Sequence, residues 1–196
     1  MRILLREDQQ SKTTERLQSG DAYNKDVAQA IEAAGADAVT VHGRHWTEDY
    51  DVGVSYRDIA QIKDLLKIPV IGNGDVHDTA SAKKMFSETG CDAIMISRTS
   101  VGQPWIFEKI YQELQGNMYF PPSLMEIGDI FLEHVEGLIA LEDEKVALLQ
   151  SRNLAKYYAR NHFDSKVFLE KINQIHTYDE LNKLVKNYFM GNTYFD

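Results

Sequence analysis

Residues Ile68–Phe107 read IPVIGNGDVHDTASAKKMFSETGCDAIMISRTSVGQPWIF, and this stretch decides the fold. A short apolar run at Val70–Ile71 leads directly into the polar turn Asn73–Asp75. A second apolar run, Ala93–Ile96, leads in the same way into Ser97-Arg98. Each run is bounded by turn residues and is too short for a helix, so both are predicted to be buried strands.

A helix is predicted between these two strands. Asp78 is a suitable N-cap, and Gly90 is a suitable residue for the left-handed position that ends a helix. Between them, Ala82, Met85 and Phe86 fall on one helical face. The order of elements is therefore strand, polar turn, helix, strand, polar turn.

The same unit occurs once earlier in the chain. A helical pattern ends at Gly35, an apolar strand follows at Ala38–Val41, and the polar residues His42-Gly43-Arg44 come next. His42 precedes Asn73 by 31 positions and Asn73 precedes Arg98 by 25, which is the length of one strand–helix step. Right-handed crossovers between parallel strands bring all three polar turns to one end of the sheet, where such folds carry their active sites.

Composition limits the class of protein. The 196 residues are 43% hydrophobic and 26% charged, with no apolar run long enough to span a membrane, so a globular chain is expected. The polar start does not resemble a secretory signal, and a single cysteine rules out an internal disulfide; both features favour the cytoplasm. The net charge of −9 means that nucleic-acid binding needs a local basic patch. No metal site is expected.

The chain divides into two expected domains, residues 1–115 and 116–196. Met1–Leu5 is interpreted as the end of a strand, and Arg6–Ala22 as a solvated loop because Leu17 is its one large apolar residue. Regular α/β patterning then continues to Gln115 and stops at Gly116–Pro122.

After this break the chain is predicted to be all-helical. Ser123 with Glu126, and Thr177 with Glu180, have the spacing of a helix-capping box. Two further helices are expected between them, over residues 146–158 and 167–172. Four amphipathic helices indicate a small bundle.

Several segments, taken in order, resemble the tRNA-dihydrouridine synthases and most closely their bacterial B-type branch. The set is specific because its members keep their order over 66 residues, whereas each alone is weak. The segments are His42-Gly43-Arg44, Tyr50, Ile68–Asp75, Thr89–Asp92, Met95–Arg98, Gly102, and Pro104–Phe107. The carboxy-terminal helices also look like the tRNA-binding bundle of that family.

The resemblance implies a TIM barrel that carries FMN, followed by a helical domain that grips tRNA. In that family NADPH reduces the flavin, the flavin passes hydride to C6 of a uracil, and a cysteine protonates C5. The family's flavin-contacting lysine would fall one position before Met1, and its catalytic cysteine further upstream. The resemblance thus implies a partial TIM barrel of the last three βα units, with no catalytic residue in this chain.

The residues expected to hold FMN follow the three strands. By resemblance, Asn73, Gly74 and Asp75 contact the cofactor: the glycine allows close backbone approach, and the amide can hydrogen-bond a ring or ribitol edge. A plain turn with Asp75 as a cap is the alternative. By the same resemblance, Ser97 and Arg98 occupy the family's Gly-Arg phosphate site, with a plain surface arginine as the alternative. The serine is a departure from the family's glycine, because its side chain would crowd a phosphate bound through backbone amides.

His42 and Arg44, which follow the first strand, are further candidate binding residues. His42 is expected to hydrogen-bond the flavin ring, with a purely structural histidine as the alternative. Arg44 is a candidate for contact with tRNA phosphate or the flavin edge, with a surface salt bridge as the alternative. Cys91 begins a strand at the opposite end of the sheet, so we expect a small buried side chain and not a catalytic acid.

Contacts to tRNA are expected from the helix over residues 146–158. Arg152, Lys156, Tyr157 and Arg160 cluster there, where the family carries a basic and aromatic signature, whereas Asn153 and Leu154 replace its Lys and His. A merely solvated charged face is the alternative, because residues 116–196 contain more acidic than basic side chains.

Three functions remain open at this point. The first is an FMN-dependent, NADPH-linked tRNA-dihydrouridine synthase in a truncated form, active only with its missing half. The second is a non-catalytic remnant that retains at most RNA binding, and the third is another flavin-binding TIM-barrel oxidoreductase. Three parallel strands also expose sheet edges, which favours self-association or pairing with an amino-terminal half.

Overall fold

The computed structural model describes residues 22–44, 51, 53–160, 162–189 and 191. The chain separates into two compact units, Met1–Ser97 and Arg98–Asp196. The expected strand at Met1–Leu5, the expected loop before Ala22, and the motif residue Tyr50 lie outside the described residues.

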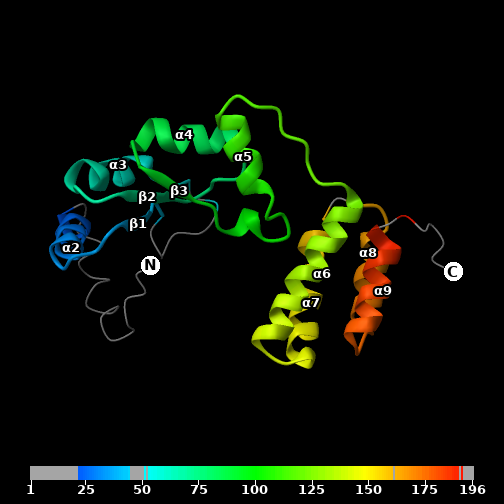
Figure 1. Cartoon of the computed structure of the whole chain (residues 1–196). Coiled ribbons are helices and arrows are strands. Elements are labelled where there is room, and N and C mark those ends of the chain that lie inside the picture. The colour runs from blue at the N-terminus through cyan, green and yellow to red at the C-terminus, as the bar shows by residue number, and fades with distance from the viewer. Residues whose placement is uncertain (1–21, 45–50, 52, 161, 190, 192–196) are drawn as a thin grey trace. The chain divides into compact units, whose positions relative to one another are not determined.

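The first unit alternates helices and strands (Figure 1). Its elements are α2 (Ala22–Ala33), β1 (Val39–His42), α3 (Tyr56–Leu65), β2 (Val70–Asn73), α4 (Thr79–Thr89) and β3 (Ala93–Met95). The strands form one parallel sheet in the order β1-β2-β3, which confirms the predicted α/β class. In the described residues the sheet is open, so the TIM barrel itself stays a prediction.

Local signals explain where these helices begin and end. Ser55 caps α3 by accepting a hydrogen bond from the Asp58 amide, and Asp78 forms a capping box with Ser81 at the start of α4. Gly90 ends α4 in the left-handed region, with φ of 64°. The predicted boundaries of α4 are confirmed because they depend on side chains that act within a single turn.

Strand register assigns the two faces of the sheet. Gly72 of β2 lies over α4: a Cβ atom there would approach the sulfur of Met85 to 2.9 Å and that of Cys91 to 3.0 Å. Cys91 is 5% exposed and thus fills the core, as predicted. Ile71 and Asn73 point to the other face, because side chains alternate along a strand.

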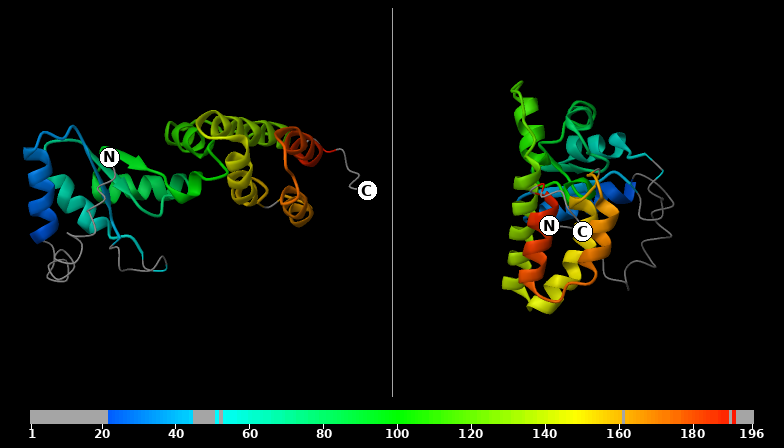
Figure 2. Two further views of the ribbon diagram at one scale, coloured as in Figure 1. Left: turned by 90° about the horizontal axis from the view of Figure 1, so that it is seen from below. Right: turned by 90° about the vertical axis from the view of Figure 1, so that its right-hand side faces the viewer.

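The second unit is helical after a short turn (Figure 2). Its elements are η1 (Arg98–Ser100), α5 (Ile106–Leu114), α6 (Leu124–Leu141), α7 (Glu144–Tyr158), α8 (Ser165–Ile172) and α9 (Tyr178–Phe189). Helices α6 to α9 enclose one apolar core whose fully buried members include Phe131, Val135, Phe168, Leu181 and Val185. This confirms the predicted four-helix bundle.

The two units separate after Ser97, whereas the expected domain boundary follows residue 115. Residues 117–123 contain no helix or strand, as the break in patterning predicts. Both capping boxes of the bundle are present: Ser123 exchanges hydrogen bonds with Glu126, and Thr177 with Glu180. The functions assigned to the two expected domains stay predictions.

Two absences hold for the described part of the chain. No helix within it is both long and apolar enough to cross a membrane. Its His, Cys, Asp and Glu side chains nowhere gather in a group of three or more that could hold a metal ion.

Candidate functional site

The carboxyl ends of β1 and β2 and the residues after β3 bring six of the predicted site residues into the first unit. In the register of the sheet His42 pairs with Asn73, and Asn73 pairs with Met95. These three residues therefore form one layer across the end of the sheet, as expected when polar turns follow parallel strands.

Asn73 is the centre of this layer. Its Nδ2 donates to the Met95 carbonyl oxygen at 2.9 Å and to Ser97 Oγ at 3.0 Å. Because the Met95 carbonyl can only accept, these contacts fix which end of the amide is the nitrogen. Both amide protons are thus used within the protein, and among the described residues Oδ1 has no hydrogen-bond partner. Asn73 can therefore offer a ligand an acceptor but no donor.

His42 is held beside Asn73 by its backbone. The Asn73 carbonyl accepts from His42 Nδ1 at 3.1 Å, which places the proton of a neutral imidazole on Nδ1. Its Nε2 has no hydrogen-bond partner within the described residues, and the side chain is exposed. A neutral His42 would then present a second acceptor at this edge.

Arg44 and Asp75 form an ion pair at the same end of the sheet. Arg44 Nη2 lies 2.6 Å from Asp75 Oδ2, and the arginine side chain is 2% exposed. The sequence predicts either contact with tRNA phosphate or the flavin edge, or a surface salt bridge. A salt bridge is found, with Arg44 buried and Asp75 one-third exposed, at 33%. A guanidinium in this position organises the turns after β1 and β2. Its contact with RNA or with the flavin edge stays a prediction.

Gly74 is explained by packing of the protein against itself. Its φ is 133°, and a Cβ atom there would come within 2.5 Å of Val54 Cγ2 and 3.4 Å of His42 Cε1. The resemblance implies that this glycine allows close approach of a cofactor. The neighbouring Val54 and the backbone angle already require glycine, so Gly74 by itself is no evidence for a ligand.

Arg98 opens the second unit, directly after Ser97. It begins η1 and is exposed. The chain turns tightly here: the Val101 amide donates to the Arg98 carbonyl at 3.3 Å, and the Gln103 amide donates to Ser100 at 3.1 Å. Both of these amides are used within the turn, and the role of Arg98 at a phosphate stays a prediction.

Besides Arg44, three residues are expected to contact tRNA, and all three lie on α7, in the second unit. Arg152 is half-buried and its Nη2 donates to the Ile175 carbonyl at 3.0 Å, so it ties α7 to the segment before α9. Lys156 is exposed, with its Nζ 4.9 Å from the centre of the Tyr157 ring. The Arg160 guanidinium lies 5.4 Å from the same ring. Tyr157 is therefore flanked by two cations.

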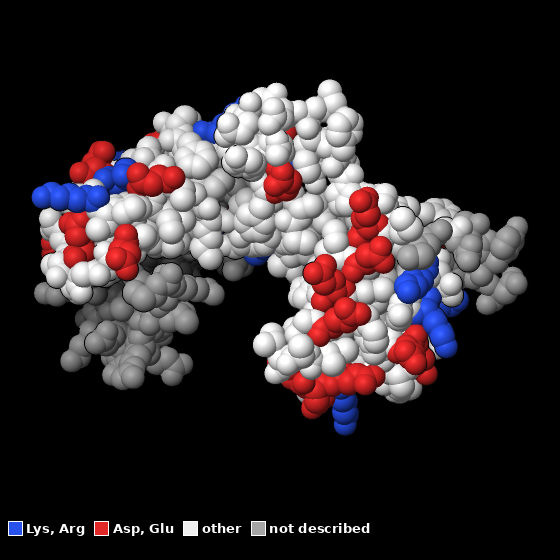
Figure 3. All heavy atoms as spheres, in the orientation of Figure 1, with Lys and Arg blue, Asp and Glu red and all other residues white. Residues whose placement is uncertain are grey.

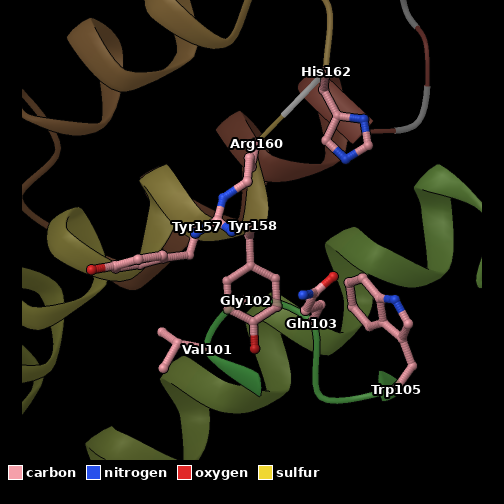
Figure 4. A pocket seen from close by; sticks show the side chains of 8 residues that line it. All are labelled: Val101, Gly102, Gln103, Trp105, Tyr157, Tyr158, Arg160 and His162. Atoms are coloured by element: carbon pink, nitrogen blue, oxygen red, sulfur yellow. The ribbon is translucent and has the colours of Figure 1, made fainter. Parts of the chain in front are cut away.

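A small open cavity of about 70 Å³ lies beside this end of α7 (Figure 4). It is lined by Val101–Gln103, Trp105, Tyr157–Tyr158, Arg160 and His162. Gly102 brings the two sides together: with φ of 77°, its added Cβ would meet Tyr157 Cβ at 2.4 Å. The sequence does not predict this cavity, although Gly102 is one of the residues that carry the family resemblance.

Acidic side chains limit where the helical unit could meet a polyanion. Exposed carboxylates recur along α6 at helical spacing, at Glu126, Asp129, Glu133 and Glu136. Figure 3 shows acidic residues gathered over the face of this unit that it draws. Lys156 and Arg160, at the end of α7, are among the exposed cations of this unit.

Comparison with known proteins gives one consistent result. Residues 12–192 match the sequence profile described as Dihydrouridine synthase (Dus). A tRNA-dihydrouridine synthase B of Xanthomonas axonopodis pv. citri is 36% identical over 83% of this chain and 49% of its own length. One of Vibrio cholerae is 32% identical over 86% of this chain and 54% of its own length. A probable tRNA-dihydrouridine synthase of Mycobacterium tuberculosis is 32% identical over 82% of this chain and 42% of its own length. The chain thus spans about half the length of these relatives, and the match covers their carboxy-terminal part.

Proposed function

This chain belongs to the dihydrouridine synthase family, and we propose that it forms the carboxy-terminal part of an FMN-dependent enzyme that reduces uridine in tRNA. NADPH is the proposed reductant. The substrate class follows from the relatives, which are tRNA-dihydrouridine synthases by name.

The observation that carries the proposal is the hydrogen bonding of Asn73. Its two amide protons are used by Met95 and Ser97, which leaves Oδ1 as an acceptor at the end of the sheet. The isoalloxazine ring of FMN has an N–H donor, and its ribitol chain has hydroxyl donors. The donor and acceptor chemistry of this edge therefore fits the cofactor.

In this proposal six residues hold FMN, each in a stated way. Asn73 and His42 accept hydrogen bonds from the ring or ribitol, and Arg98 gives charge to the phosphate. Ser97 orients the Asn73 amide through the hydrogen bond at 3.0 Å. Gly74 and Asp75 shape the turn between them, Asp75 through its ion pair with Arg44.

Bound FMN would supply the hydride chemistry, while these residues bind and orient it. Lys156 and Tyr157 are proposed to contact tRNA, because one is exposed and the other lies between two cations. Arg152 is proposed to support them through its hydrogen bond to Ile175, and Arg44 to support the flavin site. The two arginines therefore have positioning roles.

The test is retention of FMN by the purified chain through gel filtration, followed by the visible absorption bands of flavin. Arg98→Ala should lower retention by about tenfold, because it removes a charge-assisted contact to phosphate. Lys67→Ala is the control, since Lys67 is an exposed cation just before β2, at the end of the sheet opposite the proposed site. A chain that retains no flavin, or two variants that behave alike, would contradict the proposed cofactor site.

A further inference from the structure

We propose that the cavity between the Val101–Gln103 turn and the end of α7 binds a backbone phosphate of RNA, with Arg160 as its cationic ligand. The proposal deepens the proposed function, since it rests on tRNA being the substrate. All of the lining residues belong to the second unit.

The size of the cavity selects the kind of group that fits. A volume of about 70 Å³ is roughly that of five water molecules by the same measure. Sites for whole cofactors are several times larger, roughly 300–1,000 Å³. A flavin ring or a complete nucleotide is therefore too large, whereas the five heavy atoms of a phosphate group match.

The lining groups favour an anion. The lining contains no Asp or Glu side chain. Burial, with the nearby charge of Glu133, raises the pKa of the Tyr158 phenol to about 12, so it stays neutral and adds no negative charge to the lining. Its hydroxyl is hydrogen-bonded to His134 Nδ1 at 3.1 Å. Burial also lowers the pKa of His162, which leaves this imidazole mostly neutral near pH 7. Arg160 is then the charged group of the cavity.

Donors for a phosphate are available from three side chains. The Arg160 guanidinium and the Trp105 indole N–H have no hydrogen-bond partner within the described residues. Gln103 uses one amide proton on the Thr99 carbonyl, at 2.8 Å, and keeps the other. Figure 4 shows the Gln103 amide between the rings of Tyr158 and Trp105, with Arg160 and His162 above them.

The helix ends beside the cavity contribute little. The carboxyl end of α7 at Tyr158 disfavours an anion, whereas the amino end of α5 after Trp105 favours one. Each effect is about 0.3–1 kcal/mol at an exposed site, and the two have opposite sign. Binding therefore depends on Arg160, whose guanidinium is oriented by the Tyr157 ring.

The test measures binding of a fluorescent tRNA transcript to the whole chain by anisotropy, as a function of salt. Arg160→Ala should weaken binding about tenfold at low salt and reduce the salt slope by about one unit, because one phosphate contact is lost. Lys183→Ala, an exposed cation on α9 outside the cavity, is the matched control. If the two variants weaken tRNA binding equally, Arg160 contributes only non-specific positive charge, and the proposal is contradicted.

Two further readings separate the alternatives. If inorganic phosphate at millimolar concentration occupies the cavity, it should displace tRNA from the parent chain but not from Arg160→Ala. If phosphate saturates the cavity without changing tRNA binding, the cavity is a site for free phosphate, and the assignment to RNA is wrong. Arg160 is exposed, so circular dichroism should show an unchanged fold. If Arg160→Ala binds tRNA as tightly as the parent chain, only the proposal for the cavity is contradicted. If the parent chain binds no tRNA at all, the proposed function is contradicted as well.

Discussion

Single residues carry most of what this structure adds to the sequence. Arg44 and Asp75 are 31 positions apart, the same interval as the paired residues His42 and Asn73. Arg44 and Asp75 each lie two residues beyond this pair, so the register of β1 and β2 brings them opposite each other. Sequence reasoning placed both residues near the ends of strands but had no information on register, so it could not pair them.

The Arg44–Asp75 pair leads to a prediction about stability. Arg44→Ala should destabilise the chain by about 3 kcal/mol, because it leaves a carboxylate at the turn without its buried cationic partner. Urea unfolding followed by circular dichroism measures this. Unchanged stability together with weaker tRNA binding would restore the RNA-contact role that the buried position of Arg44 argues against.

Gly74 gives a second prediction at the same scale. Gly74→Ala should cost about 2–5 kcal/mol, from backbone strain and from overlap with Val54. Gly35→Ala is the control: Gly35 also has a positive φ, of 87°, but a Cβ there meets nothing within 4 Å. It should cost only about 1 kcal/mol. A Gly74→Ala chain that folds normally yet loses FMN would favour the cofactor-approach role instead.

At the scale of helices and strands, sequence and structure agree where the signal is local. The caps at Asp78, Gly90 and Ser123 act within one turn, and all three are confirmed. Agreement is weaker where packing decides. Leu124 is an apolar residue in the first turn of α6 but is 48% exposed, because the buried part of that helix starts at Ile127. Helical periodicity assigns a residue to a face, and neighbouring elements decide how far along the helix that face is covered.

Two glycines on α6 allow the packing of that helix to be measured. A Cβ at Gly128 would lie 2.9 Å from Phe189 Cβ, whereas one at Gly137 meets nothing within 4 Å. Both changes to alanine gain about 1 kcal/mol of helix propensity. Gly137→Ala should therefore stabilise the chain. The free energy of unfolding of Gly128→Ala should be about 1–3 kcal/mol lower than that of Gly137→Ala, because of overpacking. Similar thermal midpoints for the two variants would show that α9 shifts to accommodate the added methyl group without loss of stability.

Asp92 joins three elements and predicts a dependence on pH. Its carboxylate accepts from Lys63 Nζ at 2.7 Å and from the Val70 amide at 2.7 Å. These hydrogen bonds, first that of Lys63, lower the pKa of Asp92 below its ordinary value of 3.8. A depressed carboxylate pKa stabilises the fold above the unfolded-state value, and this stabilisation is lost as the pH falls through the folded-state value.

Asp92→Asn should therefore flatten the acid side of the stability curve of the first unit, while lowering its stability at neutral pH. Asp64→Asn is the control, since Asp64 is an exposed carboxylate on α3 with no hydrogen bond or ion pair among the described residues. Urea midpoints between pH 3 and pH 7 measure both. Parallel curves for Asp92→Asn and the parent chain would contradict the role given to this carboxylate.

At the scale of the whole molecule, the order of elements could be predicted but the division into units could not. Alternating strands and helices followed by helices alone can be recognised from periodicity, and α5 continues that alternation. The boundary after Ser97 depends on which neighbours α5 and the Gly102 turn contact. Gly102 meets Tyr157, 55 residues later, and no local pattern in the sequence encodes such a contact.

The open sheet gives the last prediction. β3 is the outer strand of the described sheet beside β2, and Ala93 and Met95 on it are exposed. An unpaired strand edge offers backbone groups to another chain, although three residues form a short edge, so association should be weak. We expect a concentration-dependent oligomer by sedimentation.

Ala93→Lys should reduce this association, because a charged side chain on an edge strand opposes pairing. Ala93 lies at the end of β3 away from the proposed flavin site. Leu141→Lys, which changes an exposed apolar residue at the end of α6, should leave association unchanged. A chain that remains monomeric at all concentrations, or responds equally to both changes, would show that this edge is not the surface of contact.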